Sequence, residues 1–261
     1  MMHIQLFQFE VALGDFEQNK DKITQLFKEK LVETTNIVVL PEMWNNGYDL
    51  ENLNDKADDK LKLTKEFISK LAQQYSVNIV AGSVSNKKQG DVYNTLVVFN
   101  NRGELIYDYD KIHLVPMLDE PKFMTGGHSL SQPFQLMDTT MGAVICYDLR
   151  FPESIRGMAV KGAQVIFVVA QWPEARLYHW RHLNIARAIE NDAYVIACNS
   201  CGNDHKTTYA GHSMIIDPSG EVIKEAGESE SSIFAEVDVA RVQEMRESIP
   251  VFKNRRSDLY S

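Results

Sequence analysis

Short apolar runs, separated by polar and amphipathic stretches, divide the chain into alternating strands and helices. Apolar runs that are bounded by turn residues and too short for a helix predict strands. These runs cover positions 4–9, 37–40, 77–84, 93–99, 105–109, 143–145, 165–170, 194–199, 212–216, 221–224 and 233–237. Segments whose apolar residues recur every three or four positions predict helices. These segments cover 16–31, 61–75, 154–161, 179–191 and a short stretch from 239.

Turn-forming residues join two pairs of the predicted strands into hairpins. The hairpins join 93–99 to 105–109 and 212–216 to 221–224. Between 111 and 133 there is little periodicity, and a loop of that length inside a compact domain is usually functional. Strand–helix–strand units that flank hairpins are typical of a layered α/β fold with a mixed sheet system. We expect a single domain over 1–261, because no low-complexity linker or repeat divides the chain.

Composition and charge narrow the class of protein. The formal net charge of -9 argues against a nucleic-acid partner, because such proteins usually show a basic stripe. The N-terminal positions alternate polar and apolar residues and lack the apolar core of a signal peptide. The longest apolar run, 165–170, is too short to span a bilayer. Three cysteines form an odd set, which suits a reducing compartment. We therefore expect a cytoplasmic, soluble protein with no membrane partner.

Three predicted strands are each followed by a residue with a charged or reactive side chain. Glu42 follows the strand at 37–40, Lys111 follows the strand at 105–109, and Cys146 follows the strand at 143–145. A thiolate is a nucleophile, so Cys146 needs a neighbouring base or cation to react at neutral pH. Glu42 is a candidate base for the thiol proton, and Lys111 a candidate partner for the negative oxygen of a tetrahedral intermediate. The backbone N–H of Tyr147 is a candidate second donor to that oxygen.

Each of these residues has a plainer interpretation. A free cysteine is often a small core residue, so Cys146 alone carries even odds of being structural. Lysines in hairpin strands usually lie in solvent, which is the expectation for about two such positions in three. Glu42 is also in place to cap the polar loop that follows it. Sequence alone leaves these alternatives open.

Other reactive residues are weaker candidates. Cys198 and Cys201 form a lone Cys-x-x-Cys with His205 nearby, and about one such pair in ten would bind zinc or act in redox chemistry. His113 and His179 allow a Cys–His protease dyad. No His-x-x-x-His or second Cys-x-x-Cys spacing is present, and we expect no metal.

Three motifs together resemble the signature regions of the nitrilase, or carbon–nitrogen hydrolase, superfamily. They are LPEM (40–43), YDKIHL (109–114) and CYDLRFPE (146–153), and the resemblance extends from the first strand to the tail. It implies a four-layer α-β-β-α sandwich and a catalytic triad of Glu42, Lys111 and Cys146. A further family glutamate corresponds best to Glu120, with Asp119 adjacent. The resemblance also implies a homodimer of eight layers, with the tail 249–261 at its interface.

Further segments resemble the omega-amidase branch of that superfamily. They are AQWP (170–173), HW (179–180), ARAIEN (186–191), GHS (211–213) and the tail IPVFKNRRSDLY (249–260). The branch implies hydrolysis of the terminal amide of a 2-oxo dicarboxylic acid monoamide, such as 2-oxoglutaramate or 2-oxosuccinamate, through a cysteine thioester and without a cofactor. The alternatives are an amidase of the same family for a carbamoyl amine or a deaminated peptide amide, or a catalytically silent binding module.

A substrate with a free carboxylate requires a cationic partner, and arginine pairs carboxylates in a bidentate manner. Arg150 is the first candidate, Arg176 and Arg181 are others, and an internal ion pair of Arg150 with Asp148 or Glu153 is equally expected. Two aromatic residues are candidates for the pocket wall: Trp172, which follows the strand at 165–170, and Tyr48, in the loop after Glu42.

Overall fold

The first sheet of the computed structural model, which describes residues 1–260, is built mainly from the N-terminal half of the chain. Its strand order is β15-β1-β2-β4-β5-β6, with β3 paired to β4. The pairs β1–β2 and β2–β4 are parallel, whereas β15–β1, β4–β5 and β5–β6 are antiparallel. The strands are β1 (Met2–Gln8), β2 (Ile37–Val39), β3 (Asp58–Asp59), β4 (Asn78–Lys88), β5 (Asp91–Phe99), β6 (Leu105–Asp110) and β15 (Ser231–Val237).

The second sheet comes from the C-terminal half and has the order β14-β13-β10-β9-β8-β7. Its central strands β8, β9 and β10 are parallel, and its outer pairs are antiparallel. A small separate hairpin, β11–β12, follows β10. The strands are β7 (Phe134–Leu136), β8 (Thr139–Ile145), β9 (Val165–Ala170), β10 (Tyr194–Asn199), β11 (Cys201–Asn203), β12 (Thr208–Ala210), β13 (Met214–Ile216) and β14 (Val222–Glu225).

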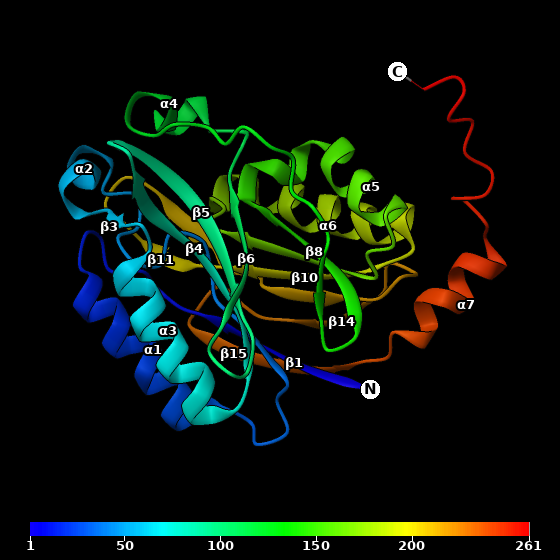
Figure 1. Cartoon of the computed structure of the whole chain (residues 1–261), viewed down its shortest axis with the longest axis horizontal. Coiled ribbons are helices and arrows are strands. Elements are labelled where there is room, and N and C mark those ends of the chain that lie inside the picture. The colour runs from blue at the N-terminus through cyan, green and yellow to red at the C-terminus, as the bar shows by residue number, and fades with distance from the viewer. Residues whose placement is uncertain (261) are drawn as a thin grey trace.

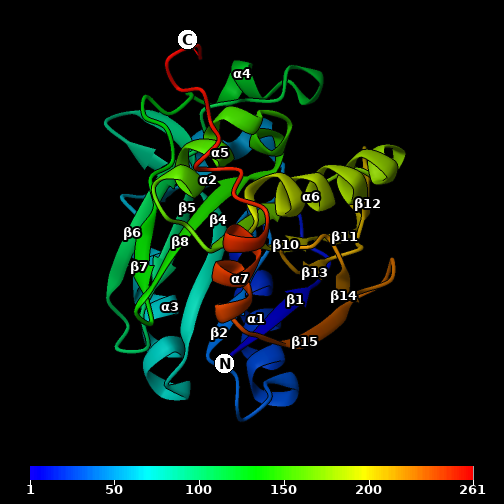
Figure 2. The same ribbon diagram turned by 90° about the vertical axis from the view of Figure 1, so that its right-hand side faces the viewer.

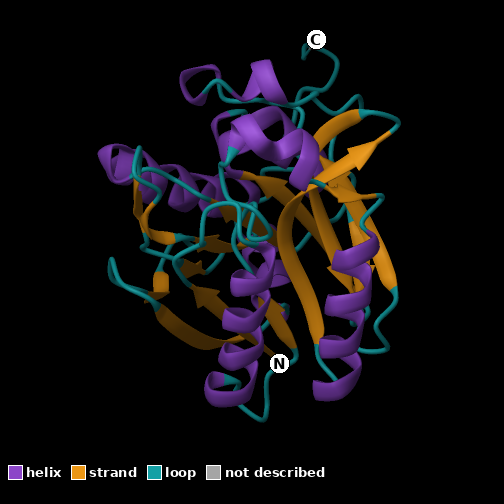
Figure 3. Ribbon diagram, turned by 90° about the vertical axis from the view of Figure 1, so that its left-hand side faces the viewer, coloured by secondary structure: helices purple, strands orange, loops and turns teal. Residues whose placement is uncertain are grey.

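Helices cover the outer faces of the two sheets (Figures 1 and 2). Helices α1 and α3 pack on the first sheet, and Figure 3 shows these two long helices on one side of the strands. Helices α5 and α6 pack on the second sheet. The helices are α1 (Phe16–Lys30), α2 (Leu53–Lys56), α3 (Lys62–Tyr75), α4 (Glu120–Phe123), α5 (Pro152–Val160), α6 (Leu177–Asn191) and α7 (Ala240–Ser248), with 3₁₀ turns η1 (Leu50–Asn52), η2 (Pro116–Leu118), η3 (Cys146–Arg150) and η4 (Glu174–Arg176).

The alternation of side chains in β1 explains why the layers stack. Ile4 and Leu6 point into the core between the sheets, whereas Phe7 and the following Phe9 pack against α1 and α3. Successive strand residues face opposite sides, so β1 supplies apolar side chains to both faces of its sheet. The predicted α-β-β-α sandwich is therefore confirmed.

Most predicted elements are confirmed, including both hairpins and the strands at 165–170 and 194–199. Asp15 caps α1, because its carboxylate accepts the N–H of Gln18 at 3.0 Å. The sequence missed β7 and the β11–β12 hairpin, since these strands are short and carry no apolar run. Among the described residues, no helix is long and apolar enough to cross a membrane.

The tail after α7 has no regular secondary structure and contacts α5 at Arg156. Its Phe252 ring sits beneath two guanidinium groups, that of Arg246 at 4.7 Å and that of Arg156 at 5.4 Å from the ring centroid. Through Phe252, the tail therefore makes at least one contact with α5 and α7 of the same chain.

A glycine in β4 allows the loop after β2 to approach the sheet. Gly82 has φ of 57° and lies at a break in the β4–β5 register, between Val80 and Ser83. A Cβ on Gly82 would collide with the backbone carbonyls of Leu40 and Pro41. This close approach places the next residue of the loop, Glu42, at the carboxyl end of the sheet.

Replacing Gly82→Ala should lower the free energy of unfolding by more than about 2 kcal/mol, because strain in φ and a steric collision add together. Urea unfolding measures the change. Gly90→Ala is the matched control, because Gly90 also has positive φ but nothing lies within 4 Å of its added Cβ. Equal losses in the two variants would contradict the role given to the Pro41 contact.

Candidate active site

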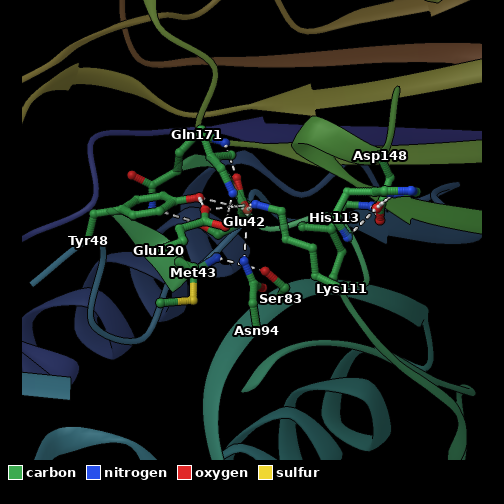
Figure 4. A network of polar contacts seen from close by, with 12 residues as sticks. Glu42, Met43, Tyr48, Ser83, Asn94, Lys111, His113, Glu120, Asp148 and Gln171 are labelled. Atoms are coloured by element: carbon green, nitrogen blue, oxygen red, sulfur yellow. Dashed lines mark hydrogen bonds and ion pairs between the residues drawn. The ribbon is translucent and has the colours of Figure 1, made fainter. Parts of the chain in front are cut away.

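Glu42 is fully buried in the loop after β2, and donors from four segments converge on its carboxylate. Its Oε1 atom accepts Lys111 Nζ at 3.0 Å, the Tyr48 hydroxyl at 2.9 Å and Asn94 Nδ2 at 2.8 Å. Its Oε2 atom accepts the backbone N–H of Gln171 at 2.8 Å. Figure 4 shows these side chains pointing at one another. Glu42 is thus fixed from both sheets, because Asn94 belongs to the first sheet and Gln171 follows β9 of the second.

Lys111 follows β6 and is also fully buried, contrary to the expectation of a solvated lysine. Its ammonium group contacts Glu42 Oε1 at 3.0 Å and Glu120 Oε1 at 2.8 Å. Burial alone would lower the pKa of Lys111, but the charges of Glu120 and Glu42 outweigh it and raise that pKa well above its usual value. The side chain is therefore a permanent cation in a low-dielectric site.

Glu120, rather than its neighbour Asp119, reaches the site. Glu120 opens α4 with a buried carboxylate that also accepts the backbone N–H of Val115 at 2.8 Å and the Tyr48 hydroxyl at 2.7 Å. Asp119 instead forms a surface ion pair with Lys122 at 2.9 Å. Burial raises the pKa of Glu120, the Lys111 charge lowers it and the Glu42 charge raises it, with a net rise. The two carboxylates therefore compete for one cation.

Cys146 is the first residue of η3, directly after β8, and it is 4% exposed. Its φ of 45° is unusual for a residue with a side chain, and such strain persists only where the surroundings fix it. Burial raises the pKa of the thiol well above its usual value, and the charge of Glu42 and a hydrogen bond with Glu42 raise it further against the opposing charge of Lys111. The resting thiol is therefore neutral and faces a carboxylate that is able to accept its proton.

A cavity of about 460 Å³ opens onto Cys146. Trp172 lines it, as predicted for the pocket wall, and so do Tyr147 and Arg150, which were predicted for the oxyanion and the substrate carboxylate. The Arg150 guanidinium lies 4.7 Å from the Trp172 ring centroid and 3.3 Å from Nδ1 of His179. Within residues 1–260 Arg150 forms no ion pair, so the alternative of a bond to Asp148 or Glu153 is wrong.

The remaining predicted residues divide between this cavity and other places. Arg176 lines the cavity, whereas Arg181 forms an ion pair with Glu225 at 3.2 Å and is not among its lining residues. Tyr48 differs from the prediction: its ring lines a neighbouring cavity of about 600 Å³, and its hydroxyl binds the two buried carboxylates. The two cavities share the wall formed by Met117, Leu118, Lys206 and Thr207.

The other cysteines and histidines do not join the site. Cys198 is fully buried between the sheets, where its thiol lies 3.5 Å from the carbonyl oxygens of Phe7 and Val39. Nδ1 of the His113 ring lies 2.7 Å from Asp148 Oδ1, so His113 is paired with Asp148 and not with Cys146. In the part of the chain that the structure describes, no three His, Cys, Asp or Glu side chains gather as a metal site would require.

The sequence interpretation missed three polar partners of the site: Asn94, Gln171 and Lys206. The role of Asn94 could have been predicted, since an amide within a largely apolar strand needs a buried hydrogen-bond partner. Gln171 could also have been predicted, because it follows β9 at the same edge of the sheet as Cys146. Lys206 lies in a polar turn, and no sequence pattern predicts its place at the site.

Comparison with known proteins agrees with this arrangement. Residues 4–247 match the family model described as carbon-nitrogen hydrolase. A protein from Staphylococcus aureus named "Hydrolase in agr operon" is 49% identical over 260 residues, which cover 99% of this chain and 100% of that protein. The "2-oxoglutaramate amidase" of Bacillus subtilis is 44% identical over 257 residues, 98% of each chain. A CN-hydrolase superfamily protein from Xanthomonas campestris, solved with an arsenic adduct in its active site, superposes with a TM-score of 0.92 at 30% identity, covering 100% of this chain and 99% of that one.

Proposed function

The chain belongs to the carbon–nitrogen hydrolase family, and from that premise we propose that it hydrolyses the terminal amide of a short 2-oxo dicarboxylic acid monoamide. The substrates are 2-oxoglutaramate or 2-oxosuccinamate, and the products are the 2-oxo acid and ammonia. The observation that carries the proposal is the convergence of buried Glu42 and Lys111 beside the cavity onto which Cys146 opens. The similarity to a 2-oxoglutaramate amidase supports the choice of substrate.

The first half of the reaction forms a thioester. The Cys146 sulfur attacks the amide carbon while the thiol proton passes to Glu42, because the neutral thiol is a poor nucleophile. The oxygen that becomes negative is stabilised by the Lys111 ammonium and by the backbone N–H of Tyr147. Glu42 then returns the proton to the nitrogen, the C–N bond breaks, and ammonia leaves.

The second half removes the acyl group. Glu42, again unprotonated, takes a proton from water as the water oxygen attacks the thioester carbon. The C–S bond breaks, and the thiolate recovers its proton as the acid leaves. Glu120 keeps Lys111 charged and oriented throughout, since it binds the ammonium as a second carboxylate beside Glu42. The Tyr48 hydroxyl joins the two carboxylates and limits their movement.

The substrate carboxylate is assigned to the cationic part of the cavity wall. Arg150 and Arg176 line that wall, and Arg150 has its guanidinium held over Trp172 rather than paired with an acidic residue of the described chain. A guanidinium that is already oriented and lacks a carboxylate partner is suited to bind one from a ligand.

Ammonia release from 2-oxoglutaramate, compared with glutamine, asparagine and a carbamoyl amine, tests the proposal. We expect preference for the 2-oxo amide, and a loss of at least about 1,000-fold in kcat for Cys146→Ala, because the nucleophile is removed. Cys201→Ala is the matched control and should retain activity. Preference for another amide would favour the alternative substrates, a carbamoyl amine or a deaminated peptide amide. Absence of turnover on the whole panel would favour the silent binding module.

Replacing Arg150→Ala should raise KM for 2-oxoglutaramate by about 10- to 100-fold, the equivalent of one charge-assisted hydrogen bond. The KM of a neutral short-chain amide should change little, since that substrate has no carboxylate to bind. Steady-state kinetics on the two substrates measure the difference. Arg181→Ala serves as the control, because Arg181 pairs with Glu225. Equal effects of Arg150→Ala on both substrates would exclude the assignment of the carboxylate to Arg150.

We also propose a homodimer in the cytoplasm, with the tail 249–261 at the interface. Exposed Ile249, Leu259 and Tyr260 in the tail support an interface, and three free cysteines suit a reducing compartment. Full-length protein should sediment as a dimer, and protein ending at Ser248 should shift towards the monomer in analytical ultracentrifugation. A stable dimer of the truncated protein would contradict the proposal that the tail forms the interface.

A further inference from the structure

One buried carboxylate outside the triad, Asp148, connects the segment of Lys111 to the segment of Cys146. Asp148 lies two residues after Cys146 and is fully buried. Its Oδ2 atom accepts the backbone N–H of Ile145 at 3.2 Å and the Tyr109 hydroxyl at 3.0 Å. Its Oδ1 atom accepts Nδ1 of His113 at 2.7 Å and the backbone N–H of the same residue at 3.3 Å. Both oxygens of a buried charge are thus satisfied.

The positions of these donors in the chain are informative. Tyr109 and His113 stand two residues before and two residues after Lys111, and both bind the same carboxylate. The third donor, Ile145, immediately precedes Cys146. Figure 4 shows the His113–Asp148 contact beside Lys111 and apart from the cluster around Glu42. One side chain therefore fixes both flanks of the lysine to the backbone that leads into the cysteine.

The partners of Asp148 are themselves held in place. The His113 ring stacks on Phe151, with ring centroids 3.6 Å apart and planes 5° from parallel. The backbone N–H of Phe151 donates to the Asp148 carbonyl oxygen at 2.9 Å. Burial, followed by the charge of Asp148, raises the pKa of Tyr109, so its hydroxyl keeps the proton that it donates. The His113 ring is thus restrained by a second contact, and the Tyr109 hydroxyl also accepts the backbone N–H of Ile112 at 3.4 Å.

The strained backbone of Cys146 requires such restraints. A positive φ at a residue with a side chain costs about 1–3 kcal/mol and is kept only where neighbouring contacts fix it. The bond from the Ile145 N–H to Asp148 constrains the residue that immediately precedes the strained Cys146. A displacement of about 1 Å between reacting groups is enough to cost about 100-fold in rate.

We propose that Asp148 and His113 are positioning residues that hold Lys111 in register with Cys146. This inference rests on the proposed function, because it assigns these two residues to the alignment of that same site. The simpler role would be structural: Asp148 would close the turn at the start of η3, and His113 would add only stability. The two roles predict different activities for variants that still fold. A positioning role lowers kcat in a folded variant, whereas a purely structural role leaves it unchanged.

The test compares His113→Ala with His113→Asn, because an asparagine amide occupies nearly the place of Nδ1 and donates to Asp148. For His113→Ala we expect kcat to fall by about 10- to 100-fold, with KM within about 2-fold, because alignment is lost and the cavity remains. His113→Asn should recover most of kcat. Thermal unfolding establishes that each variant is folded, and Tyr109→Phe should lower kcat in the same way.

The matched control is Tyr107→Phe, which removes a hydroxyl from the same strand where it binds Ser131 rather than Asp148. It should leave kcat unchanged. A second readout needs no substrate: the rate at which iodoacetamide labels Cys146 should fall in His113→Ala and recover in His113→Asn. This readout separates the two hypotheses, since labelling differences persist even if the wild-type protein hydrolyses none of the amides. A His113→Ala protein with wild-type kcat and labelling rate would overturn the proposal, as would equal losses in His113→Ala and His113→Asn.

Discussion

The burial of one ammonium group governs the arrangement of the whole site. Lys111 has no access to solvent, and a lone buried cation would be prohibitively unstable, so the fold must supply negative charge on two sides. Glu42 comes from the loop after β2 and Glu120 from the start of α4, two loops far apart in the chain. Each carboxylate needs further donors in turn, and these are Asn94, Tyr48 and backbone N–H groups. The polar cluster is thus one continuous network whose members depend on one another.

The same network sets the chemistry. Burial raises the pKa of the Cys146 thiol first, and the negative charges of Glu42 and Glu120 raise it further against the charge of Lys111, so the thiol stays protonated. A cysteine in this environment is unlike one activated by a preformed imidazolium, because its proton must leave during the attack rather than before it. Glu42 is the group placed to take that proton, and Lys111 compensates the charge that then develops on the substrate oxygen.

Much of the fold followed from the sequence because the strands are covered on both faces and appear as continuous apolar runs, as β9 and β10 do. The convergence of Glu42, Lys111 and Cys146 was also predictable, since all three follow strands. The local environment of each of these residues was not predictable from the sequence. Composition favoured an exposed Lys111, and only tertiary contacts with Glu42 and Glu120 reverse that expectation. The hydroxyl of Tyr48 likewise points to the carboxylates because of how its loop folds back, which no periodic pattern records.

The site joins residues that are far apart in sequence. The hydrogen bond from the Gln171 backbone to Glu42 spans 129 residues and links the ends of strands in different sheets. Non-local contacts of this kind form late in folding, after the entropy of closing a long loop has been overcome. During synthesis, Glu42, Lys111 and Cys146 all emerge before Gln171, whose backbone N–H binds the Glu42 carboxylate. A partly made chain therefore carries a thiol without its base in place, so reactivity arises only when both sheets have docked.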